Sequence, residues 1–119
     1  VEQYSTARVA IVPSFFEGFG FPASEAMACG FAVIANAAGA LPEVVGSDGH
    51  AGRLVPQRNA RALVDAMWDI LKDPAETARM GHAARERVQR VFQWDQAAAQ
   101  LVDVFQEVAN ASDRRSRAA

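Results

Sequence analysis

The sequence is poor in cysteine: Cys29 is the only one, so no disulfide can form within the chain. A single unpaired thiol is typical of a reducing compartment, and we expect this one to be a small buried side chain and not a nucleophile. No apolar run reaches the roughly 18–20 residues that cross a bilayer. The first residues also lack the basic segment and apolar core of a signal peptide. These absences predict a cytoplasmic protein.

Metal ligands and an excess of positive charge are missing as well. The two histidines, His50 and His82, lie far apart, and no spacing of His, Cys or carboxylate residues matches a metal site. Twelve Lys and Arg against fourteen Asp and Glu give a net charge of −2, which does not favour a nucleic-acid surface. We therefore expect no metal, no cofactor and no nucleic-acid partner.

The chain of 119 residues, half of them hydrophobic, is long enough for one globular domain. Apolar runs at 7–12, 31–36 and 51–55 predict short strands, and the first two have no polar alternation, so both faces should be covered. We expect the domain to occupy 1–112 and the charged tail 113–119 to fray. Strands that alternate with helices predict an α/β fold with a Rossmann-like parallel sheet and flanking helices.

Helices are expected after each strand. Pro22 and Pro42 suit the first turns of the first two, and Asn59 and Asp73 are predicted N-caps of two longer ones. A last helix is expected from Asp95. The charged residues of the fourth helix are expected to face mainly solvent, and these are Arg79, Arg85, Glu86, Arg87 and Arg90.

The stretch 13–30 combines a strand end, a glycine turn and the start of a helix. Gly18 and Gly20 enclose Phe19, so the backbone can turn sharply there and approach a ligand closely. The free N–H groups and the dipole of a helix N-terminus both attract a phosphate. Alone, however, a Gly-x-Gly pattern is a weak signal.

A glutamate stands on each side of this turn. Glu25, about one turn inside the helix, can accept hydrogen bonds from two vicinal hydroxyls, as a ribose presents. Glu17 lies at the strand end, where open α/β sheets bind ligands. The residues alone leave a simpler interpretation open, in which Glu25 complements the helix dipole and Glu17 is a solvated loop charge.

Glu17 and Glu25 are separated by seven residues, and with the segments 18–22 and 26–30 they resemble the signature of retaining glycosyltransferases of family four, which have the GT-B fold. The segment 38–45, Ala-Gly-Ala-Leu-Pro-Glu-Val-Val, resembles the same family's Gly-Gly-x-Pro-Glu-hydrophobic segment, with alanine at the first glycine. The resemblance extends over about residues 4–105.

The resemblance implies a partial C-terminal half of a GT-B fold that binds a nucleotide-diphosphate sugar and transfers its sugar to a sugar, lipid or other acceptor. It places Glu17 beside the transferred sugar as the catalytic residue and Glu25 on the ribose. The donor-binding residues that it implies are Gly18, Phe19, Gly20, Phe21, Pro22, Glu25, Gly39, Ala40 and Leu41. Because a diphosphate leaving group needs N–H donors and cations, helix N-termini can serve without metal.

The family also uses an Arg and a Lys from an earlier segment, and an acceptor domain, none of which is present in these residues. Arg8 and Arg53 are the only basic residues expected near the sheet, and neither is a good substitute. Val1 in place of Met predicts that the chain continues a longer polypeptide, whose N-terminal domain is its missing partner. We therefore expect no activity from the isolated chain.

Two further expectations concern assembly and location. The open edge of the strand at 7–12 predicts self-association of the chain, most simply as a homodimer. The longer enzyme is expected in the cytoplasm, with a peripheral membrane location left open. The alternative function is a non-catalytic nucleotide-sugar-binding or assembly module.

Overall fold

The computed structural model describes the backbone of residues 7–117 and the side chains of residues 7–111. The chain forms two compact units, one that reaches Gln89 and one that begins at Arg90. Among the helices between residues 7 and 117, none has the length and apolar composition needed to cross a bilayer.

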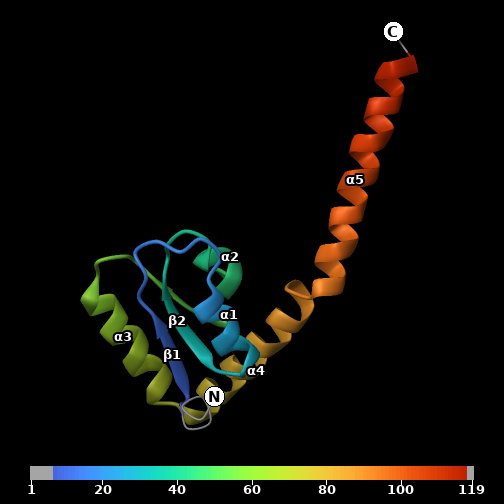
Figure 1. Cartoon of the computed structure of the whole chain (residues 1–119). Helices are drawn as coiled ribbons and strands as arrows, with labels where there is room; N and C mark the ends of the chain where they lie inside the picture. The colour runs from blue at the N-terminus through green and yellow to red at the C-terminus, as the bar shows by residue number, and fades with distance from the viewer. Residues whose placement is uncertain (1–6, 118–119) are drawn as a thin grey trace. The chain divides into compact units, whose positions relative to one another are not determined.

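The first unit contains a parallel three-stranded sheet, in the order β1-β2-β3 (Figure 1). Its strands are β1 (Val9–Val12), β2 (Ala32–Asn36) and β3 (Gly52–Val55). In register, Ile34 at the centre of β2 pairs with Ile11 on one side and Arg53 on the other. All three predicted strands are confirmed, each slightly shorter than its apolar run.

Five helices lie within the described residues. They are α1 (Phe21–Ala28), α2 (Leu41–Val45), α3 (Ala60–Leu71), α4 (Pro74–Val91) and α5 (Trp94–Arg117). The two predicted caps are confirmed: Asn59 Oδ1 accepts a hydrogen bond from the amide of Ala62 at 3.0 Å, and Asp73 Oδ1 accepts from two amides at the start of α4. Local side-chain chemistry thus sets where the longer helices of the first unit begin.

The core of the first unit lies between β2 and the helices α3 and α4. Ala32 and Ile34 pack with Ile70 of α3 and Met80 of α4, all of them buried. Every residue of β2 is buried, which confirms that both faces of this strand are covered. In β1 only Val12 is fully buried and Ile11 is 40% exposed, so the same expectation is wrong for β1. Among the described strands β1 pairs only with β2, so it lies at the edge of the sheet and less of it is covered.

The second unit is essentially the helix α5. Apolar side chains along it are more than half exposed, and these include Leu101, Val102, Phe105 and Val108. The helix begins one residue before the predicted Asp95 and continues to Arg117, through most of the segment 113–119. The domain limit at residue 112 and the self-association of the β1 edge both stay predictions.

Candidate functional site

Two connecting segments meet at the carboxyl edge of the sheet. Residues 13–20 join β1 to α1, and residues 37–40 join β2 to α2. Because β1 and β2 are parallel neighbours, both connections leave from the same edge (Figure 1). The carboxyl edge of an open α/β sheet is where ligands bind in such folds.

A backbone hydrogen bond ties the two segments together. The amide of Ala40 donates to the carbonyl oxygen of Glu17 at 3.0 Å. Gly39, with φ +51°, lies directly beneath, and a Cβ atom at this position would overlap that same carbonyl oxygen. Gly39 is therefore required both by its left-handed backbone and by the close approach of Glu17. The preceding Ala38 is buried.

A second contact joins the helices that follow. Gly20 precedes α1 with φ +97° and is buried. A Cβ atom on Gly20 would stand 3.3 Å from Val44 Cγ2 and 3.4 Å from Leu41 Cδ2, both on α2. The glycine turn thus lets α1 begin against α2, and the two sequence motifs form one packed block.

The side chain of Glu17 is held by a chain of hydrogen bonds that starts inside the sheet. Asn36, the last residue of β2, is 5% exposed, and its Nδ2 donates to the carbonyl oxygen of Ser14 at 3.1 Å. The Ser14 hydroxyl donates in turn to Glu17 Oε2 at 3.4 Å. Glu17 itself is half-buried. Sequence reasoning missed Ser14 and Asn36, although a polar residue that ends an apolar run was a usable signal in both cases.

Glu25 has a different environment on α1. Its side chain is exposed and, among the described residues, makes no hydrogen bond or ion pair. The neighbours Ala23, Ala26 and Met27 are buried and fix the inner face of the helix. Glu25 therefore projects from a rigid helix toward solvent, where it is open to a ligand.

The amides at the start of α2 are already used by the protein. Ala40 N–H donates to Glu17, and Leu41 N–H donates to the carbonyl oxygen of Ala38 at 3.0 Å. The side chain of Leu41 is fully buried. The expectation that free N–H donors are found here is thus wrong for Ala40 and Leu41, because both amides brace the turn. Contact of Gly39, Ala40 and Leu41 with a donor stays a prediction.

Aromatic side chains cluster around the connection 13–20 and the first residue of α1. Four phenylalanines are exposed there, namely Phe15, Phe16, Phe19 and Phe21. The rings of Phe19 and Phe21 lie 4.6 Å apart between centroids at an interplanar angle of 35°. The segment predicted to bind a donor, residues 18–22, thus carries an exposed apolar surface beside Pro22.

Arg58 is a basic residue at this edge that sequence reasoning missed. It follows β3, has φ +58°, and its guanidinium lies 5.7 Å from the ring centroid of Phe15. With Phe15, Asn36 and Leu63 it lines a hollow between the strand ends and the start of α3. The expectation that Arg8 and Arg53 are the only basic residues near the sheet is therefore wrong.

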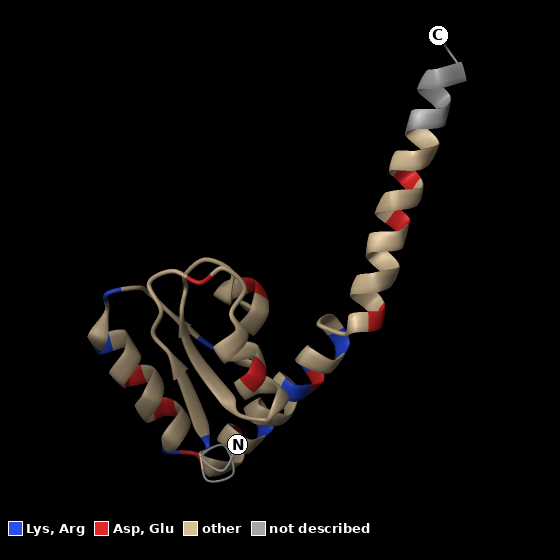
Figure 2. Ribbon diagram, in the orientation of Figure 1, with Lys and Arg blue, Asp and Glu red and all other residues tan. Residues whose placement is uncertain are grey.

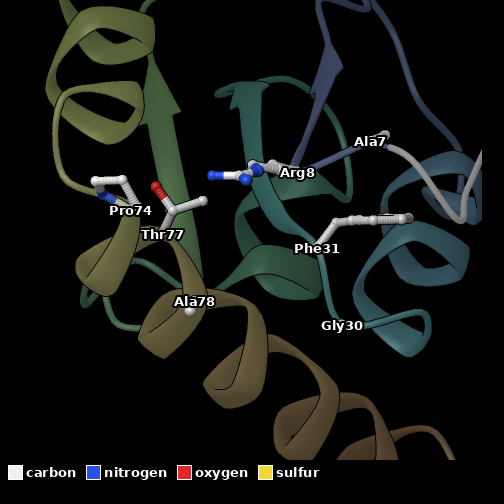
Figure 3. A pocket seen from close by; sticks show the side chains of 7 residues that line it. All are labelled: Ala7, Arg8, Gly30, Phe31, Pro74, Thr77 and Ala78. Carbon is white, nitrogen blue, oxygen red and sulfur yellow. The ribbon is translucent and has the colours of Figure 1, made fainter.

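Arg8 lies at the other end of the strands, away from their carboxyl ends. It lines a separate hollow formed with Gly30, Phe31 and Thr77, at the amino ends of the strands (Figure 3). Since this edge faces away from the two motif segments, Arg8 has no part in the candidate site. This placement agrees with the expectation that Arg8 is not a good substitute for the missing cations.

The charged groups whose pKa values shift lie on exposed surfaces, and Figure 2 shows how charge is distributed along the helices. The amide of His50 lowers the pKa of Asp48, Lys72 lowers that of Asp69, and Arg79 lowers that of Glu76.

Within the described residues no group of three His, Cys, Asp or Glu side chains could hold a metal ion. Cys29 is exposed at the end of α1, so the expectation of a buried thiol is wrong.

Comparison with known proteins gives a consistent family. The family model described as glycosyl transferases group 1 matches residues 1–87. The MMP alpha-(1->4)-mannosyltransferase of Mycolicibacterium hassiacum is 45% identical over 87% of this chain and 25% of its own length. Sucrose-phosphate synthase from Thermosynechococcus elongatus superposes with a TM-score of 0.81 at 44% identity, over 92% of this chain and 27% of that chain.

A more distant likeness concerns the fold alone. The Anabaena protein HepE, solved in complex with UDP, has a TM-score of 0.81 at 23% identity and covers 89% of this chain and 29% of that chain. In all three comparisons the chain spans about a quarter of the length of the protein that it matches. The match is therefore to one part of longer proteins.

Proposed function

Because the chain belongs to the glycosyl transferases of group 1, we propose that it is the donor-binding part of a retaining, metal-independent hexosyltransferase. Its substrate is a nucleotide-diphosphate sugar, and the sugar passes to a sugar, lipid or other acceptor. The observation that carries this proposal is the hydrogen bond from Ala40 to Glu17, which joins the two motif segments into one block at the carboxyl edge.

In this proposal the two glutamates have separate tasks. Glu17, held by Ser14 and half-buried, lies beside the transferred sugar. Glu25, exposed on a rigid helix, accepts hydrogen bonds from the ribose hydroxyls. Charged acceptors of this kind form hydrogen bonds about twice as strong as neutral ones.

The departing diphosphate is stabilised by electrostatic donors. Near the start of α1, Pro22 has no N–H and Ser24 N–H already donates to the carbonyl oxygen of Gly20, so the amides of Phe21 and Ala23 are the ones that suit a phosphate oxygen. Arg58 adds a positive charge at the same edge of the sheet. Such preorganised groups need no metal ion, so EDTA is expected to leave donor binding unchanged.

The isolated chain is proposed to bind the donor weakly and to transfer nothing. It spans about a quarter of its relatives, and among the described strands β1 pairs only with β2. The remaining cations and the acceptor site belong to the rest of the longer protein. A non-catalytic binding module is the alternative, in which a longer chain would bind the donor and never transfer the sugar.

Nuclear magnetic resonance on the labelled chain tests donor binding directly. We expect sugar nucleotides that carry uracil, guanine or adenine, added one at a time to millimolar concentration, to shift the amides of residues 17–25. The amides of α5 serve as the internal control. If none of these compounds shifts residues 17–25, the proposal fails. Transfer is then tested in the longer protein, where binding without transfer supports the alternative module.

A further inference from the structure

Arg87 on α4 makes a contact that its sequence context did not predict. It was expected to face solvent, yet it is half-buried, and its guanidinium reaches across to α2. Nε donates to the carbonyl oxygen of Val44 at 2.9 Å, and Nη2 donates to the carbonyl oxygen of Glu43 at 2.7 Å. These contacts connect residues more than forty positions apart in the chain.

The guanidinium sits where a short helix most needs support. The last carbonyl groups of a helix have no partner inside it, and a cation there also complements the helix dipole. Gly46 follows α2 with φ +87°, and a Cβ atom on it would stand 3.2 Å from Arg87 Cζ. The backbone at Gly46 thus passes close to the guanidinium, and the guanidinium caps the carboxyl end of α2.

The other end of α2 is tied to the candidate site. Ala40, which precedes the helix, donates to the carbonyl oxygen of Glu17. A helix of five residues cannot hold itself together, because isolated helices of fewer than about 12 residues are marginal in water. Its position therefore depends on these two attachments and on the burial of Leu41, Val44 and Val45.

We propose that Arg87 is a positioning residue, which holds α2 and through it fixes segment 39–41 and the backbone of Glu17. Its effect on sugar transfer rests on the proposed function, whereas its effect on α2 does not. The planar fork of arginine is essential to this role, because two neighbouring carbonyl oxygens are bound by two different nitrogen atoms.

Another arginine on the same helix provides a matched control. Arg79 lies two turns earlier on α4, and its guanidinium pairs with Glu76 of the same helix; the two side chains are 51% and 36% exposed. Replacing Arg79 therefore removes the same charge and the same side-chain type without touching α2. Arg87→Lys keeps the charge but offers a single point of contact.

Amide hydrogen exchange on the 119-residue chain tests the structural part. In Arg87→Met we expect the protection of the amides of Val44, Val45 and Gly46 to fall at least about tenfold, the scale for losing hydrogen bonds to a charged group. Arg87→Lys should lower this protection by about half as much on a logarithmic scale. Arg79→Met should keep the protection of the wild type. Equal protection in Arg87→Met and wild type would overturn the proposal.

Donor binding and kinetics in the longer protein test the functional part. Arg87→Met should raise the donor KM about tenfold through segment 39–41 and also lower kcat through Glu17, and Arg87→Lys should lie between it and the wild type. Lost protection with unchanged donor KM and unchanged kcat would show that Arg87 braces the fold only, and would overturn the positioning role. A wild-type protein that binds no sugar nucleotide would overturn the proposed function, while the exchange data would still decide whether Arg87 holds α2.

Discussion

The surroundings of the two motif glutamates differ sharply. Glu17 is enclosed by the protein: its carbonyl oxygen accepts from Ala40, its carboxylate accepts from Ser14, and Gly39 packs directly beneath it. Glu25 stands on an ordinary helix with its side chain exposed, and this side chain makes no hydrogen bond or ion pair with the described residues. The fold therefore fixes both the backbone and the side chain of Glu17, whereas it fixes only the backbone of Glu25.

This difference matches the tasks proposed for the two residues. A group beside the reacting centre has to be held close to its productive geometry before the substrate arrives. A group that binds hydroxyls at the far end of the donor can order itself on binding, at a cost of side-chain entropy. The four changes below test whether the contrast between Glu17 and Glu25 is real.

Gly39→Ala should have the largest effect, because it forces Glu17 out of place. A left-handed conformation costs an alanine about 1–2 kcal/mol, and overpacking against the Glu17 carbonyl oxygen adds about 1–3 kcal/mol. Urea unfolding measures the loss. Gly49→Ala shares the positive φ but meets only the flexible Arg53 side chain, and Gly18→Ala meets nothing within 4 Å. Equal losses for residues 39 and 49 would mean that the contact with Glu17 is unimportant.

Glu17→Ala should lower turnover in the longer protein by roughly 100-fold, with a much smaller change in donor affinity, since the lost interaction acts on the transition state. Stopped-flow or steady-state kinetics with separate donor titrations would show the split. A variant that loses affinity and keeps kcat would make Glu17 a binding residue, and the contrast with Glu25 would disappear.

Glu25→Gln should weaken donor binding in the longer protein by roughly 1–3 kcal/mol, the scale for a hydrogen bond to a charged group. Stability should stay within about 0.5 kcal/mol of the wild type, because the Glu25 side chain is exposed and has no hydrogen-bond or ion-pair partner among the described residues. Calorimetry measures the binding, and Glu107→Gln on α5 is the control. An unchanged dissociation constant would remove Glu25 from the ribose.

Ser14→Ala should have the smallest effect, because its hydroxyl is 3.4 Å from Glu17 Oε2 and supplies one modest hydrogen bond. We expect turnover to fall by the equivalent of roughly 0.5–1.5 kcal/mol, with donor affinity retained. Ser14→Thr keeps the hydroxyl and should restore turnover, while Ser47→Ala in an exposed turn should change nothing. No rescue by threonine would argue that Glu17 does not depend on this hydroxyl.

Much of the first unit could be predicted because its signals are local. Apolar runs mark the three strands, and the side chains of Asn59 and Asp73 cap the helices that follow them within three residues. The residues of the segments 17–30 and 38–45 together were likewise sufficient to indicate the family, which the comparisons confirm. In each case the decisive contact lies within a few positions or within a recognisable motif.

Contacts between distant residues could not be predicted. Arg87 looks like any other charged residue of α4, and its bonds to α2 depend on how two helices pack. Arg58 has a left-handed backbone conformation that brings its guanidinium near Phe15, and the sequence does not predict this conformation. The exposure of Ile11 reflects which strand ends up at the edge of the sheet, and this depends on neighbours outside β1.

The close approach of Gly39 to Glu17 limits how this region can be re-engineered. A side chain at residue 39 and the carbonyl oxygen of Glu17 would occupy the same space, and a Cβ atom on Gly20 would make a tight contact of 3.3 Å with Val44 Cγ2. Changes in one motif therefore have to be matched in the other. Chimeras designed to alter donor preference should exchange residues 13–46 as a single cassette. Grafting either motif alone would pack one motif of this chain against the other motif of a different protein.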